Sequence, residues 1–204
     1  KNLSSFALMQ LVSAILIPVV MTAIRLEIVD VESKTQAGYW EAIHRLSGYY
    51  MMFFTTLMTV YVLPKLSSAS NNKEFRDEIV NFYKTVLPFF AIGMLIIYFM
   101  KIIVIKVVFT SEFMPMQSLF GWQLLGDLFK IMSVVIAYQF LAKNMFWSYI
   151  ITEFISIAII YLSSMYLIGE HGFIGASMAH FFSYVCYLIV VLFFFRKALF
   201  GIKV

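Results

Sequence analysis

Six apolar runs separated by short polar segments constrain this chain more than any other feature. Each run is about 20 residues or longer, which is the length that an α-helix needs to cross the hydrocarbon core of a bilayer. The runs cover approximately residues 3–24, 43–62, 86–108, 117–142, 147–168 and 173–195. They predict an all-α, polytopic membrane protein in which six transmembrane helices form one bundle.

The overall composition agrees with this fold class. The chain is 62% hydrophobic and 13% charged, whereas soluble domains carry about 25% charged residues. No linker, internal repeat or low-complexity tract interrupts the sequence, so residues 1–204 are predicted to form a single transmembrane domain. The one cysteine, Cys186, lies in an apolar run and cannot form an internal disulfide.

Prolines help to place the ends of the spans. Pro64 is predicted to end the second span, while Pro88 and Pro115 lie at or before the starts of the third and fourth. Proline is tolerated at helix starts and disrupts helix interiors. Pro18 lies inside the first run, and it predicts a kink there.

Two connecting segments have a distinct character. Residues 26–42 are rich in acids and are predicted to form an external loop between the first two spans. Residues 74–84 place apolar side chains at 75, 79, 82 and 83, a spacing typical of a short amphipathic helix at the membrane surface.

Basic residues are distributed unequally between the two sets of loops. Nine of the 15 Lys and Arg residues fall on one side of the predicted bundle: Lys1, Lys65, Lys73, Arg76, Lys84, Lys143, Arg196, Lys197 and Lys203. Cytoplasmic loops carry an excess of basic residues. The even number of spans therefore predicts a multi-pass protein with both ends of this chain in the cytoplasm.

The fourth run carries polar groups at membrane depth. Gln123, Asp127 and Lys130 follow one another at helical steps of four and three, so they share one face of a helix. A charge at bilayer depth costs about 2.5–3.5 kcal/mol on insertion scales, and such groups face a bundle interior or a watery cavity. Two interpretations remain open: a transport path, or an ion pair between Asp127 and Lys130 that only holds helices together.

The second run begins with a basic residue and continues with a polar stripe. Helical spacing from Arg45 passes Tyr49, Thr56 and Thr59. Arginine binds phosphate through a planar, bidentate fork. Arg45 is either a contact for an anionic head group or an interfacial arginine that reaches toward lipid phosphates.

Two more titratable residues lie inside spans. Glu153 in the fifth run is predicted to pair with a base such as Lys130 or Arg45, or to take up a proton. His180 in the sixth run is either a proton relay or a hydrogen-bonded packing residue.

No enzymatic signature is found in the sequence. There is no Cys/His metal spacing, no glycine-rich phosphate loop and no G-x-S-x-G motif. We therefore expect no catalysis, no metal and no cofactor. The basic residues flank membrane spans and do not form a nucleic-acid patch, so we expect no nucleic-acid partner.

Several motifs resemble those of one family of transporters. They are G-Y-W at 38–40, Y-V-L-P-K-L-S at 61–67, L-F-G-W-Q-L-L-G-D-L-F-K at 119–130, Ala142-Lys143, Glu153, and H-G-F-I-G-A at 171–176. In this order they resemble the C-terminal half of the Wzx-type polysaccharide-repeat flippases, which belong to the multidrug/oligosaccharidyl-lipid/polysaccharide (MOP) exporter superfamily. The similarity is greatest to the flippases of O-antigen and of enterobacterial common antigen, and it covers essentially the whole chain.

The resemblance implies an architecture and a function. It implies that this chain is the second six-helix lobe of a twelve-helix MOP-type flippase in the bacterial inner membrane. The whole protein would move an undecaprenyl-diphosphate-linked oligosaccharide across that membrane by alternating access. Because a first lobe is not present in the 204 residues, we expect the chain to be a fragment that does not transport by itself. Further expected partners are membrane lipids and the polymerase and chain-length regulator of the same polysaccharide pathway.

The resemblance also gives the intramembrane residues expected roles. Lys130 and Arg45 would contact the diphosphate, while Gln123 and Tyr49 would meet sugar hydroxyls. Asp127, Glu153 and His180 would provide charge pairing or ion coupling.

Two other functions remain open. One is an ion-coupled exporter of drugs or organic cations from the same superfamily, in which intramembrane acids bind the cation. The other is a membrane scaffold that does not transport, which would tolerate neutral residues in place of Asp127 and Lys130.

Overall fold

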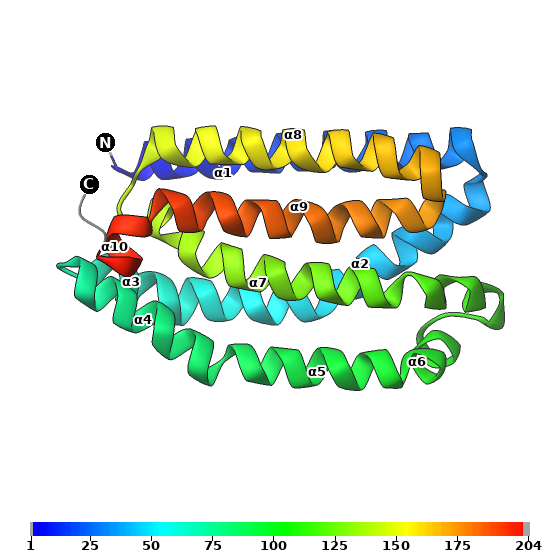
Figure 1. Cartoon of the computed structure of the whole chain (residues 1–204), viewed down its shortest axis with the longest axis horizontal. Helices are drawn as coiled ribbons and strands as arrows, with labels where there is room; N and C mark the ends of the chain where they lie inside the picture. Colours follow the sequence, from blue (N-terminus) through cyan, green and yellow to red (C-terminus); the bar gives the residue numbers. More distant parts are fainter. Residues whose placement is uncertain (1, 202–204) are drawn as a thin grey trace.

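A computed structural model describes the backbone of residues 2–201 and the side chains of residues 7–201, and it is helical almost throughout (Figure 1). The α-helices are α1 (Asn2–Val31), α2 (Lys34–Leu57), α3 (Leu63–Ser68), α4 (Asn72–Thr85), α5 (Leu87–Phe99), α6 (Lys101–Val108), α7 (Phe120–Ala142), α8 (Phe146–His171), α9 (Phe173–Phe194) and α10 (Arg196–Phe200). A π-helical segment, η1 (Met58–Val62), joins α2 to α3, and a 3₁₀ segment, η2 (Ser111–Ser118), precedes α7. Six helical stretches in the described part are long and apolar enough to cross a membrane. The predicted all-α bundle of six spans is thus confirmed.

Helix α7 lies at the centre of this bundle. It packs against α9, α3, α5 and α2. Half of the residues in its apolar stretch are buried, compared with 11% of those in the apolar stretch of α8. The peripheral helices instead expose large apolar side chains, such as Phe99 on α5 and Trp147 on α8. The polar segment of the fourth span therefore runs through the interior and not along the lipid-facing surface.

The segment between the first two spans is helical, contrary to the prediction of a loop over residues 26–42. Helix α1 continues through Pro18 to Val31, and α2 begins at Lys34. Ser33 lies between the two helices and caps the N-terminus of α2. Its side-chain oxygen accepts a hydrogen bond from the backbone N–H of Gln36 (3.3 Å). Charged side chains at a membrane surface are compatible with helix ends, so their acidity did not require a loop.

The second span does not end at Pro64. Helix α2 passes through η1, where the backbone N–H of Leu63 donates to the carbonyl of Met58, and then continues as α3 to Ser68. Proline removes one backbone donor and crowds the preceding turn. A π-type turn just before Pro64 provides a wider hydrogen-bonding pattern at that point, so the helix continues.

The third span also differs in its bounds. The amphipathic helix predicted near 74–84 is present as α4, and its apolar residues Phe75, Ile79 and Phe82 are buried. Helix α4 runs into α5 after one residue, and the span ends at Phe99 because the backbone leaves helical geometry at Met100. The predicted extension to residue 108 forms the separate helix α6. A position of α4 at the membrane surface remains a prediction.

Gly172 and Glu32 connect the end of α1 to the start of α9. Gly172 has a φ of +59°, a conformation that L side chains rarely adopt. The backbone N–H of the next residue, Phe173, donates to Glu32 Oε2 over 3.0 Å. The carboxylate of Glu32 thus sits at the N-terminus of α9, where negative charge is favourable.

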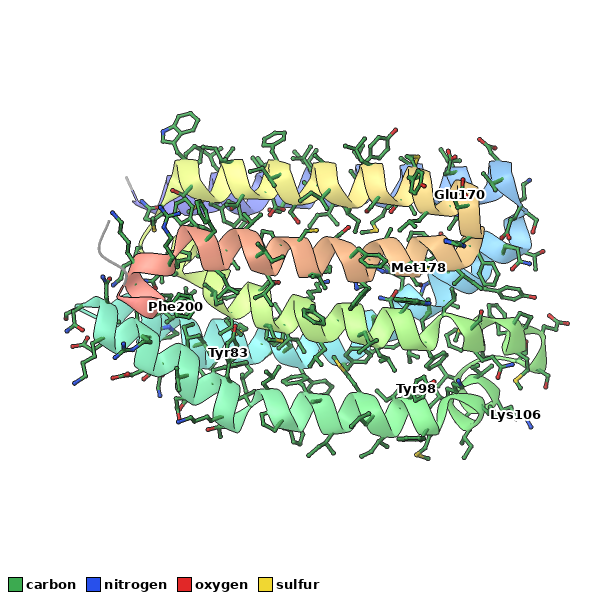
Figure 2. The ribbon with its side chains drawn as sticks, in the orientation of Figure 1. Tyr83, Tyr98, Lys106, Glu170, Met178 and Phe200 are labelled. Carbon is green, nitrogen blue, oxygen red and sulfur yellow. The ribbon has the colours of Figure 1, made fainter. Side chains whose placement is uncertain are left out.

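The chain ends and the basic segments gather at the same end of the bundle. Figure 1 shows the two ends of the chain beside α3, α4 and α10, while the α1–α2 turn and η2 lie at the opposite end. Figure 2 places Phe200 at the first end and Lys106 and Glu170 at the second. Within residues 2–201 the structure therefore separates the two groups of charged segments as predicted, while Lys1 and Lys203 lie outside the described residues. The assignment of the first end to the cytoplasm remains a prediction.

Candidate functional site

Asp127 is the centre of a buried polar cluster that joins three helices. Its Oδ1 lies 2.9 Å from Nε2 of His180 on α9, and its Oδ2 accepts a hydrogen bond from Ser47 Oγ on α2 (2.6 Å). The hydroxyl of Tyr50, also on α2, donates to the same Oδ2. The aspartate is 1% exposed. Both carboxylate oxygens are thus satisfied, as a charge buried in an apolar bundle requires.

Gly126 allows the two helices that carry Asp127 and His180 to approach closely. A Cβ atom at this position would overlap the His180 ring and lie 3.1 Å from Cα of Phe181. The ring of His180 also contacts Tyr184 edge-on, with 4.9 Å between centroids. The pairing between α7 and α9 consequently depends on the absence of a side chain at residue 126.

Gln123 belongs to the interior of the same cluster. Its Nε2 donates to Asp127 Oδ2 over 3.5 Å, and its Oε1 accepts from Ser177 Oγ over 3.4 Å. The residue is 1% exposed. In this conformation its amide is engaged by protein groups and is not presented to a sugar.

Lys130 does not pair with Asp127, although the two residues share a helix face. Among the side chains that the structure describes, no carboxylate oxygen lies within the 4.0 Å ion-pair distance of Lys130 Nζ. Nζ instead lies 5.3 Å from the centroid of the Tyr184 ring, at cation–π distance. The oxygens of Asp127 are directed to His180, Ser47 and Tyr50, so the lysine has no protein counter-ion in direct contact.

Lys130 lines a cavity of about 300 Å³ between α1, α2, α7, α8 and α9. Its polar lining includes both charged and aromatic side chains, namely Lys130, Glu153, His44, His180, Tyr149 and Tyr184. Tyr149 also makes a 2.6 Å hydrogen bond to Ser13 on α1. Glu153 and Lys130 face the same cavity from different helices, and they form no ion pair. The space can accept a group that carries negative charge and hydroxyls.

Arg45 and Tyr49 lie elsewhere. Arg45 lines a second pocket of about 320 Å³ together with Arg25, Glu41 and His44. Tyr49 is 56% exposed on the outer surface of α2. The structure thus brings Asp127, His180 and Gln123 into one cluster and Lys130, Glu153 and His180 to one cavity, while Arg45 and Tyr49 stand on a different face.

The polar stripe predicted from Arg45 does not include the residues of α2 that face inward. His44, Ser47 and Tyr50 follow at steps of three, one residue out of phase with the stripe that begins at Arg45. Ser47 and Tyr50 bind Asp127, and His44 lines the Lys130 cavity. Their spacing was a usable signal, since residues three apart share a helix face.

The fold and the polar interior define the class of protein. The membrane-capable helices of the described part enclose a polar cluster around the Asp127 carboxylate and a cavity lined by Lys130. Intramembrane ionisable residues of this kind typically mark a substrate or ion pathway. The chain is therefore a multi-pass membrane protein whose interior holds ionisable side chains.

Sequence comparison relates the chain to flippases in particular. It is 30% identical over 186 residues to the Lipid III flippase of Escherichia coli (strain K12), a match that covers 91% of this chain and 45% of that protein. The Lipid III flippase of Shigella flexneri matches to the same extent. The chain spans about half the length of the curated relatives it matches. No family model and no solved structure match the sequence.

These comparisons confirm the resemblance to polysaccharide-repeat flippases that the motifs indicated. The relatives are named for the transport of a lipid and not for a chemical reaction. The extent of the match is consistent with a C-terminal half of such a protein.

Proposed function

We propose that this chain is the second six-helix lobe of a flippase in the bacterial inner membrane. The complete two-lobe protein would move undecaprenyl-diphosphate-linked oligosaccharide repeat units, of the O-antigen or enterobacterial common antigen type, from the cytoplasmic to the periplasmic leaflet by alternating access. Two facts support this proposal: the similarity to Lipid III flippases over 91% of the chain, and a bundle of six spans in a chain that covers 45% of those relatives.

The observation that carries the proposal is the environment of Lys130. An ammonium group held inside a membrane bundle costs about 2.5–3.5 kcal/mol on insertion scales. In the part of the chain that the structure describes, Lys130 lies at cation–π distance from the ring of Tyr184, forms no ion pair and lines a cavity. A diphosphate that enters this cavity would provide the missing negative charge, and the lysine would replace part of the water that the phosphate loses.

The remaining site residues have supporting roles in this proposal. Glu153 faces the same cavity from α8 without pairing with Lys130, and it would tune the charge of the cavity. Asp127 is held by His180 and by α2, which keeps it from neutralising Lys130. Arg45 and Tyr49 are available on the outer face of α2 to a substrate, or to the first lobe, that contacts that face.

A second function is supported by one feature of the cavity. Its carboxylate, Glu153, and its tyrosine rings resemble the surroundings that bind organic cations. An ion-coupled drug exporter would use them in that way. The same cavity contains Lys130, which would repel a cation, so the anionic lipid is the preferred substrate.

Substitution of Lys130 tests the proposed function. In the complete protein that carries this chain, Lys130→Ala should abolish surface polysaccharide export at normal expression. Removing one partner of a buried charged contact weakens binding by about 2–5 kcal/mol. Lys130→Arg, which keeps the positive charge, should retain part of the export. Surface polysaccharide is measured by gel electrophoresis, and the amount of protein by immunoblot.

The matched control is Lys106→Ala, because Lys106 is an exposed lysine on α6 at one end of the bundle. It should export normally. Full export by Lys130→Ala would reject the role of the lysine. Loss of drug resistance with intact polysaccharide export would instead favour the drug exporter.

A further inference from the structure

A crevice of about 310 Å³ lies where α5, α6, η2 and α7 meet, at the end of the bundle that carries η2 (Figure 1). It is bordered by Tyr98 of α5, Lys101 of α6, Gln117 of η2, and Gly121, Trp122 and Leu125 of α7. None of its lining residues also lines the Lys130 cavity. The crevice is therefore a space of its own, on a different part of the lobe.

Two local features of the backbone leave this space open. Helix α5 ends at Phe99, the backbone at Met100 is not helical, and α6 starts again at Lys101. On the α7 side, a Cβ atom at Gly121 would lie 3.8 Å from the ring of Tyr98, which is an ordinary contact distance. Glycine at this position thus borders the crevice without filling it, whereas a long side chain would occupy the space.

Lys101 gives the crevice a positive charge that no lining acid neutralises. Its Nζ lies 4.5 Å from the centroid of the Tyr98 ring, at cation–π distance. In the part of the chain that the structure describes, no carboxylate oxygen comes within 4.0 Å of this ammonium group. Gln117 is exposed and contributes an amide that can donate two hydrogen bonds. Ser118 also lines the crevice, but it donates its hydroxyl to the carbonyl of Pro115 (2.9 Å). The ammonium and amide donors match the oxygens of a phosphate.

The surroundings of the crevice are apolar and exposed on the surface of the bundle. Leu125 is 47% exposed, and so is a similar part of Phe182 on α9, whose ring centroid lies 6.1 Å from that of Trp122. The crevice also lies where the third span ends, and tryptophan and tyrosine concentrate at membrane–water interfaces. A soluble anion would contact only the polar wall, whereas a phospholipid would cover both walls with its head group and its acyl chains.

We propose that this crevice binds an anionic phospholipid from the leaflet at that end of the bundle. Lys101 and Gln117 contact the phosphate, Trp122 and Tyr98 flank the glycerol backbone, and the acyl chains extend past Leu125. Basic pockets between membrane helices bind anionic head groups in this way. A zwitterionic lipid is disfavoured, because its amine would bring a second cation to a crevice that has no lining acid.

The inference is independent of the proposed flippase function. The crevice and the Lys130 cavity share no side chain, so the crevice can hold a membrane lipid whether or not the cavity binds a lipid-linked oligosaccharide. A lipid in the crevice contacts α5, α6, η2 and α7 together. It should therefore slow hydrogen exchange in residues 98–118, which form three of these four elements.

Hydrogen exchange of the purified complete protein tests the site. The protein that carries this chain is stripped of lipid in detergent and titrated with phosphatidylglycerol, and the protection of residues 98–118 gives an apparent affinity. Lys101→Met keeps the apolar stem and removes the charge, so this affinity should fall about fivefold or more. Gly121→Leu should weaken binding similarly, because it fills the crevice. Leucine also favours a helix over glycine, so the unfolding temperature of this variant without lipid should not fall.

The matched control is Lys106→Met, because Lys106 is an exposed lysine on the same helix and lines neither the crevice nor the Lys130 cavity (Figure 2). It should bind phosphatidylglycerol like the wild type. The proposal is overturned if Lys101→Met keeps the wild-type affinity, or if Lys106→Met loses as much affinity as Lys101→Met, which would indicate diffuse attraction to lysines. Equal protection by phosphatidylcholine would overturn the requirement for an anionic lipid. Equal protection by glycerol 1-phosphate would overturn the requirement for acyl chains, and thus the lipid as the occupant.

Discussion

Asp127 bonds across the bundle to His180, with 2.9 Å between Oδ1 and Nε2, and not along its own helix to Lys130. The contact between Asp127 and His180 joins α7 to α9. The hydrogen bonds that Ser47 and Tyr50 donate to Asp127 add α2 as a third helix. This arrangement also leaves Lys130 available to the cavity. One carboxylate therefore both stabilises the centre of the bundle and determines which charge faces the empty space.

Removing the Asp127 side chain should destabilise the bundle strongly. Asp127→Ala leaves His180, Ser47 and Tyr50 without their shared acceptor, and breaking a buried charged network costs about 3–5 kcal/mol. Asp127→Asn keeps an acceptor oxygen and should cost less. Thermal unfolding of the purified protein in detergent measures both. Asp77→Ala, at an exposed position on α4, is the control and should unfold like the wild type; an equal unfolding temperature for Asp127→Ala would disprove the structural role.

Two glycine-to-alanine substitutions should have opposite effects. At Gly126 the added methyl group meets the His180 ring and the backbone of Phe181, so α7 and α9 must separate at a cost of about 1–3 kcal/mol. At Gly93 on α5 nothing lies within 4 Å of the added atom, and alanine favours a helix over glycine by up to about 1 kcal/mol. Unfolding temperatures should therefore fall for Gly126→Ala and stay equal or rise for Gly93→Ala. The same shift in both variants would contradict the close approach of α7 and α9.

Lys143 should stabilise the end of the second span. Its Nζ donates to the carbonyls of Ser67 (2.9 Å) and Ala69 (2.7 Å), which lie at the C-terminal end of α3. Lys143→Met keeps the apolar stem and removes these donors, so we expect a loss of about 1 kcal/mol of stability. Hydrogen exchange in residues 63–69 should increase. Lys73→Met, at an exposed site on α4, provides the comparison and should leave that exchange unchanged.

The two ends of the bundle should label from opposite sides of the membrane. In a background with Cys186→Ser, Asn72→Cys lies at the first residue of α4, and Thr35→Cys lies in the first turn of α2. The excess of basic residues near Asn72 predicts a cytoplasmic position for it. A membrane-impermeable maleimide added to intact cells should label only Thr35→Cys. Labelling of Asn72→Cys under the same conditions would reverse the predicted orientation.

Much of this architecture was predictable from the sequence, because apolar length sets the number of spans. The segment with Asp127 and Lys130 was expected in the interior, and α7 is the most deeply buried span. Helical spacing established that these two residues share a face. It did not establish which partner each would choose, because that depends on side chains from α2 and α9 that are distant in the sequence.

The remaining differences between the predicted and the observed helices have local causes. The stripe from Arg45 was one residue out of phase with the inward face of α2, and a step of one residue turns a helix by about 100°. Pro64 was expected to end its span because an unmodified α-helix is disrupted there, and no residue pattern indicates the wider turn before it. The acidic residues between the first two spans are compatible with both loops and helix ends, so composition was not sufficient to distinguish them.

The wider turn at Met58–Val62 has a consequence for everything that follows it in this span. An added residue in a helical rod rotates the continuation by about 100° about the axis. With α3 rotated in this way, Leu66 is fully buried and α3 packs against α7. Deleting one residue from the turn, such as Val60, would swing Leu66 out toward the lipid and bring a neighbouring side chain inward. The π-helical segment thus sets the rotation of α3 about the helix axis independently of the rotation of α2.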